Sequence, residues 1–63
     1  MWEINNMGNA INRETNDEIY MRPCIDGMIH VFFNKKRLAK FDYLKDAKKF
    51  IERKVEELNS VDK

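Results

Sequence analysis

The sequence has few of the residues that cross-link or interrupt small proteins. Cys24 is the only cysteine, so no disulfide can form within the chain, and a lone thiol favours a reducing, cytoplasmic location. Gly8 and Gly27 are the only glycines, which excludes a glycine-rich phosphate-binding loop. No apolar run is long enough to span a membrane, and the first residues lack the features of a signal peptide. We therefore expect a cytoplasmic protein with no membrane segment.

The chain is also short, and its length limits how much of it can be buried. Its 63 residues predict one small domain, 1–63. A chain of this size buries only about 60% of the surface that its unfolded form exposes. Without disulfides, domains this small often rely on oligomerisation or on a bound partner. We therefore expect a homodimer or a complex with a protein partner.

One amphipathic helix over about residues 42–58 is the clearest predicted element. Asp42 stands at the expected N-cap position, and Asn59 with Ser60 is expected to end the helix. No glycine or proline interrupts this range. Apolar residues recur in it at steps of three and four, as on one face of a helix: Leu44, Ala47, Ile51, Val55 and Leu58.

A β-hairpin is predicted upstream of the helix. Asp26-Gly27 is a strong signal for a two-residue type I′ turn, and both flanks, 19–25 and 28–33, are rich in strand-forming residues. Residues 37–41 read as a third strand, and the N-terminal part could add another. The sequence therefore predicts an α+β fold, in which a three- to four-stranded antiparallel sheet precedes one C-terminal helix.

The hairpin register predicts which side chains share a face of the sheet. A two-residue loop at 26–27 pairs Cys24 with Ile29 and Tyr20 with Phe33, and side chains then alternate between the faces. One face is expected to carry Met21, Pro23, Ile25, Met28, His30 and Phe32, together with Ala39 and Phe41. The other is expected to carry Cys24 and an apolar set that the single helix cannot cover: Tyr20, Ile29, Val31, Phe33 and Leu38.

An exposed apolar face of this kind generally marks an interface. We therefore predict a protein interface formed by Tyr20, Ile29, Val31, Phe33 and Leu38. The alternative is that the N-terminal segment covers this face through its own apolar side chains, which are Trp2, Ile4, Met7 and Ile11.

No set of residues indicates catalysis or metal binding. Cys24 and His30 are expected on opposite faces, and no second cysteine or histidine is present to complete a zinc site. The carboxylates of the helix alternate with lysines, as on a solvated surface. We therefore predict no catalytic residue, no metal and no cofactor, and a protein that is not an enzyme.

Positive charge is concentrated in one part of the chain. Residues 1–32 carry a net charge of −3 and residues 33–63 a net charge of +4. A local basic patch can bind phosphates even where the net charge is small. The candidate nucleic-acid-binding residues are Lys35, Lys36, Arg37, Lys40, Lys45, Lys48 and Lys49.

The predicted layout carries a resemblance. A hairpin, a basic turn, a third strand and then Phe41-Asp42-Tyr43-Leu44-Lys45-Asp46-Ala47 opening a helix resemble the small N-terminal DNA-binding domain of tyrosine-recombinase integrases. The layout is also similar to the plant ethylene-response DNA-binding domain. The resemblance covers residues 19–58 and implies DNA contacts made by a three-stranded sheet. Arg22 and Lys40 are the only basic residues expected on the outer face, fewer than these families carry.

Two functions follow as hypotheses. The first is a small regulatory or inhibitory protein that acts through protein–protein contacts. Asn, Ile and Lys supply 21 of the 63 residues, a bias typical of AT-rich genomes, which suggests an origin in a phage or mobile element. The alternative is a DNA-binding module that uses the sheet and the basic region 35–49.

Overall fold

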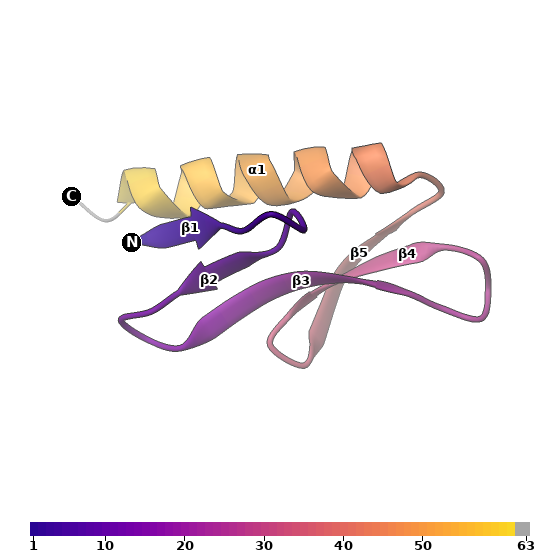
Figure 1. Ribbon diagram of the computed structural model, residues 1–63, viewed down its shortest axis with the longest axis horizontal. Helices are drawn as coiled ribbons and strands as arrows, with labels where there is room; N and C mark the ends of the chain where they lie inside the picture. Colours follow the sequence, from indigo (N-terminus) through magenta and orange to yellow (C-terminus); the bar gives the residue numbers. More distant parts are fainter. Residues whose placement is uncertain (62–63) are drawn as a thin grey trace.

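The protein is a five-stranded antiparallel sheet with one long helix packed along one face (Figure 1). The computed structural model describes residues 1–61. The strands follow one another across the sheet in chain order, so the predicted α+β fold is confirmed, with five strands rather than three or four. The elements are β1 (Trp2–Ile4), β2 (Ala10–Asn12), β3 (Asp17–Pro23), β4 (Ile29–Phe33), β5 (Lys36–Phe41) and α1 (Leu44–Val61).

The turn between β3 and β4 differs from the predicted type I′ turn. Gly27 has a φ of 80°, but Asp26 does not share a positive φ, which a type I′ turn requires. The Gly27 amide donates to the Cys24 carbonyl at 3.0 Å, and the Cys24 amide donates to the Met28 carbonyl at 3.1 Å. The loop therefore has three residues, 25–27, as in a type I turn followed by a left-handed glycine.

This extra loop residue shifts the hairpin register by one. Tyr20 pairs with Phe32 rather than with Phe33, and Pro23 pairs with Ile29. Because side chains alternate along a strand, a shift of one residue turns all of β4 over. The expected distribution between the faces is therefore wrong for β4, whose Ile29, Val31 and Phe33 lie on the face that α1 covers. We call this the inner face, and the opposite one the outer face.

The core forms between the inner face and the apolar stripe of α1. Ile19, Val31 and Ile51 are completely buried, and the Phe41 and Phe50 rings lie 5.5 Å apart across the two layers. The periodicity that predicted the helix thus corresponds to its buried side. The buried hydrophobic residues are Trp2, Ala10, Ile19, Val31, Ala47, Ile51 and Val55.

The N-terminal segment extends the sheet instead of covering its second face. β1 pairs with β2, and β2 pairs with β3, so all three lie side by side in the sheet. Trp2 is buried beside Phe33, with their ring centroids 5.7 Å apart. The segment therefore does not fold over a face of the sheet as the alternative expected, although its Trp2 packs on Phe33, one of the residues it was expected to cover.

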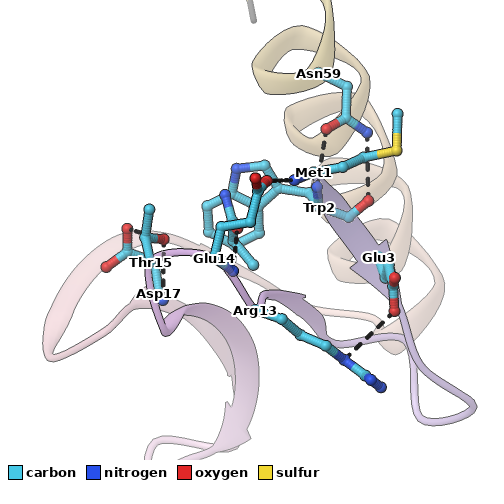
Figure 2. Close-up of polar contacts among 9 residues, drawn as sticks. Met1, Trp2, Glu3, Arg13, Glu14, Thr15, Asp17 and Asn59 are labelled. Carbon is cyan, nitrogen blue, oxygen red and sulfur yellow. Dashed lines mark hydrogen bonds and ion pairs between the residues drawn. The ribbon is translucent and has the colours of Figure 1, made fainter.

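Asn59, in the last part of α1, holds the open edge of β1 (Figure 2). Its side-chain oxygen accepts from the Trp2 amide at 3.0 Å, and its side-chain nitrogen donates to the Trp2 carbonyl at 3.4 Å. The amide side chain thus takes the place that a neighbouring strand would have beside β1. Figure 2 also shows the exposed ion pairs nearby, which join Arg13 to Glu3 and the N-terminal amino group to Glu14.

The helix is longer than the predicted range of 42–58. It begins at Leu44, because the Tyr43 carbonyl, and not Asp42, takes the N-cap position and accepts from the amides of Asp46 and Ala47. It continues past Asn59, whose side chain is held by β1, to Val61. Within residues 1–61, no helix is long and apolar enough to cross a membrane.

Candidate functional site

The outer face of β3, β4 and β5 is the most distinctive surface of the protein. The helix packs on the inner face, and the described chain places no other element over the outer one. Cross-strand pairing arranges its side chains in two neighbouring rows, which are Arg22–His30–Lys40 and Tyr20–Phe32–Arg37.

An aromatic strip runs through the middle of these rows. The Tyr20 and Phe32 rings are stacked, with centroids 5.5 Å apart and planes 18° from parallel. His30 lies next to Phe32, at 6.3 Å between centroids and 26° between planes. Tyr20 and Phe32 remain only half-buried. The strip therefore offers aromatic surface to a ligand while packing the outer face.

Asp26 fixes the position of His30. Its Oδ2 lies 3.0 Å from His30 Nε2, and its Oδ1 accepts from the Met28 amide at 3.0 Å. The Met28 amide first, and His30 second, lower the pKa of Asp26 below its ordinary value of 3.8. The charge of Lys40 adds a smaller effect in the same direction. A carboxylate at the hairpin tip thus holds the imidazole, which is only 9% exposed.

The outer face and its rim have an excess of positive charge. Cations border the aromatic strip along the edge strand β5, where each row ends in a basic residue, and Arg22 of β3 lies beside His30. On β3, β4, β5 and the turns between them, five basic residues stand against three carboxylates: Arg22, Lys35, Lys36, Arg37 and Lys40 against Asp17, Glu18 and Asp26.

The five residues of the predicted protein interface do not share a face. Tyr20 lies on the outer face, and Leu38 is the extra residue of an irregularity opposite Val31 and Phe32, where it is 36% exposed. The other three lie under the helix, because the three-residue turn shifts the β3–β4 register by one residue. They are Ile29, Val31 and Phe33, of which Val31 is fully buried.

The seven residues of the predicted basic region are also divided. Arg37 and Lys40 lie on the outer face, and Lys35 and Lys36 lie at the turn and start of β5. The remaining three, Lys45, Lys48 and Lys49, belong to α1, on the other layer of the protein. A flat ligand on the outer face would meet Arg37 and Lys40 but not the three lysines of α1, because the sheet lies between them.

Three residues of the outer face were missing from both predicted sites. Arg22, His30 and Phe32 lie together there, because their alternation with Met21 and Val31 places them opposite the core. Alternation along β3 and β4 is visible in the sequence. It could have identified these residues only if the length of the turn at 25–27 had been known.

Cys24 belongs to the turn that joins β3 and β4. It is half-buried at the hairpin, with its Sγ 3.8 Å from the Arg22 carbonyl oxygen. In the part of the chain that the structure describes, no group of three or more His, Cys, Asp or Glu residues could hold a metal ion.

A shallow hollow adjoins the aromatic strip at the β4–β5 turn. Its volume is about 500 Å³, and Glu18, Tyr20, Asn34 and Lys35 line it. Asn34 has a φ of 57° and is held firmly by the Glu18 backbone. Its backbone amide donates to the Glu18 carbonyl at 2.8 Å, and its side-chain Oδ1 accepts from the Glu18 amide at 3.0 Å. Its Nδ2 donates to Asp17 at 3.0 Å and thereby lowers the pKa of Asp17. The wall of the hollow is therefore largely pre-formed.

A second, more apolar groove lies elsewhere. It measures about 400 Å³ and is lined by residues of the β1–β2 loop, the inner face and the start of α1: Met7, Asn9, Met21, Pro23, Ile29 and Leu44. It contains no charged side chain.

Comparisons of this chain with protein-family models, with curated proteins and with solved structures found no match. The resemblance of the layout to the integrase DNA-binding domain therefore stays a prediction.

Proposed function

We propose that the protein is a non-enzymatic binding protein that contacts nucleic acid through its outer face. One observation carries the proposal, the pair of rows Arg22–His30–Lys40 and Tyr20–Phe32–Arg37 on a sheet face that α1 leaves uncovered.

The composition of these rows suits a nucleic acid better than an apolar ligand. Arg22, Arg37 and Lys40 can neutralise phosphates, which supply most of the affinity in such complexes. Tyr20 and Phe32 provide π surface between these cations, where bases can stack without sequence preference. Phosphate and base contacts are thus available on the same surface.

A protein partner or a second copy of the chain is the second candidate. Its strongest support was a continuous apolar face, but Ile29, Val31 and Phe33 belong to the core side. Tyr20 and Leu38 remain as accessible apolar contacts, and they support a regulatory or inhibitory protein–protein contact less well. In either case we place the protein in the cytoplasm, because the single thiol of Cys24 favours a reducing compartment.

A pair of charge-matched triple variants tests the proposal. The first replaces Arg22, Arg37 and Lys40 with serine, and all three are exposed on the outer face. The control replaces three exposed lysines of α1 with serine, which removes the same charge from the other layer: Lys45, Lys48 and Lys49. Binding of fluorescein-labelled oligonucleotides is measured by anisotropy between 50 and 200 mM salt.

The wild-type protein and the α1 variant are expected to bind alike, with affinity that falls as salt rises. Three single-strand phosphates would give a log–log slope near −2, or roughly a twentyfold loss over this range. The outer-face variant should lose most of the affinity and of the slope. Equal losses in both variants, or no binding by the wild type, would contradict the proposal. Saturable binding to a protein partner that is insensitive to salt and depends on Tyr20 and Leu38 of this chain would favour the second candidate.

A further inference from the structure

We infer that the hollow lined by Glu18, Tyr20, Asn34 and Lys35 holds one unpaired nucleobase, so that the ligand of the outer face is a single strand of DNA or RNA. This inference rests on the proposed function and specifies its ligand. Two features of the structure support it: the position of Tyr20 and the polar groups of the hollow.

Tyr20 connects the hollow to the aromatic strip. Its ring stacks on Phe32 and also lines the hollow. A base in the hollow would therefore contact an aromatic side chain that is already held in place by its neighbour. Such base–aromatic stacking is a common means of binding unpaired strands, whereas a base within a duplex has both faces occupied by its neighbours.

The polar groups of the hollow predict which base it prefers. The Glu18 carboxylate is exposed and can only accept hydrogen bonds, so it suits a base with an exocyclic amino group, such as cytosine. The Lys35 ammonium lies on the same rim and can pair with the phosphate next to that base. Asn34 keeps the wall in position through its bonds to Asp17 and Glu18. Thymine and uracil present carbonyl oxygens in place of the amino group of cytosine and should bind less well.

The test compares binding of labelled octamers of dC, dT and rC and of a mixed-sequence duplex. We expect dC to bind at least fivefold more tightly than dT, and either single strand to bind more tightly than the duplex. Tyr20→Ala should weaken dC binding about tenfold, whereas Tyr20→Phe should keep it, because phenylalanine also stacks. Glu18→Gln should remove the preference for dC over dT. Glu56→Gln, the same change on the exposed side of α1, should leave the preference unaltered. Comparison of the rC and dC octamers shows whether RNA or DNA binds more tightly.

The outcomes separate this inference from the proposed function. If the duplex binds as tightly as the single strands and the binding still requires Arg22, Arg37 and Lys40, the proposed function holds and the inference is wrong. It is also wrong if Tyr20→Ala binds dC normally, or if Glu18→Gln keeps the full preference for dC. If no nucleic acid binds to the wild type, the proposed function itself fails. Glu18 is exposed, so Glu18→Gln decides the matter even if Tyr20→Ala does not fold.

Discussion

The contact between Asn59 and Trp2 allows a sharp test of how the N-terminal strand is held. β1 has a hydrogen-bonded neighbour on one side only, and the Asn59 side chain pairs with its backbone on the other. Asn59→Leu removes both hydrogen bonds and leaves a partly buried amide and carbonyl of Trp2 without these partners. Leaving such a buried group without a partner lowers the free energy of unfolding by about 1–3 kcal/mol. Because the bond to the carbonyl is long, at 3.4 Å, we expect a decrease of about 1–2 kcal/mol in the free energy of unfolding.

Trp2 is itself the probe for this measurement. It is the only tryptophan of the chain and is 8% exposed, so its fluorescence reports on the docking of β1. Urea unfolding is followed by this fluorescence and by far-ultraviolet circular dichroism, which reports mainly on α1. In Asn59→Leu the fluorescence transition should come at lower urea than the dichroism transition, because an edge strand can detach before the rest of the sheet unfolds. The melting temperature should fall by about 4–8 °C for each kcal/mol lost.

Two further variants complete the design. Ser60→Ala changes the exposed neighbour of Asn59 and should leave both transitions in place. Asn59→Asp keeps an acceptor for the Trp2 amide but loses the donor to the carbonyl, and it adds a negative charge near the helix C-terminus, which is unfavourable. It should therefore also be destabilised. If Asn59→Leu unfolds within about 0.3 kcal/mol of wild type, with both transitions coincident, the side chain does not hold β1 and this reasoning is refuted.

Three further predictions concern the core and the hairpin turn. Ile51→Ala should lower the free energy of unfolding by about 2–5 kcal/mol in urea titrations, because Ile51 is fully buried, whereas Ile25→Ala at the exposed hairpin tip should change it by less than about 0.5 kcal/mol. Gly27→Ala should lower the free energy of unfolding by about 1 kcal/mol through the φ of 80° alone, since a Cβ there would meet no atom within 4 Å. Gly27→Asn should lower it less, and a decrease well above about 1 kcal/mol in Gly27→Ala would indicate a steric clash. The hydrogen bonds that the folded protein makes to Asp26 lower its pKa below 3.8, so its stabilising effect is complete above that pH and is lost as the pH falls through the lower folded value. As the pH falls from roughly 5 to 2.5, the free energy of unfolding should therefore decrease less in Asp26→Asn than in wild type. The same pH profile for both proteins in urea titrations would contradict this.

Elements with local signals could be predicted from the sequence alone. The helix was predictable because the steps between Ala47, Ile51 and Val55 match its 3.6-residue period, and such a period is a property of neighbouring residues alone. The hairpin at Asp26-Gly27 was predictable because glycine readily adopts the left-handed backbone that its turn requires. Within the helix, only the two ends differed from the prediction. Its beginning depended on which carbonyl, of Asp42 or Tyr43, accepted the first helical bond.

Which residues come into contact depends on long-range pairing and packing. An Asp-Gly pair fits both a two-residue and a three-residue loop, and the choice between them turns β4 over and moves Val31 from the expected open face into the core. The pairing of Asn59 with Trp2 joins residues 57 positions apart, and no local pattern encodes such a separation. The candidate site on the outer face follows from the same choice of loop. Strand alternation defines two faces, but only the packing of the helix determines which of them stays open to a ligand.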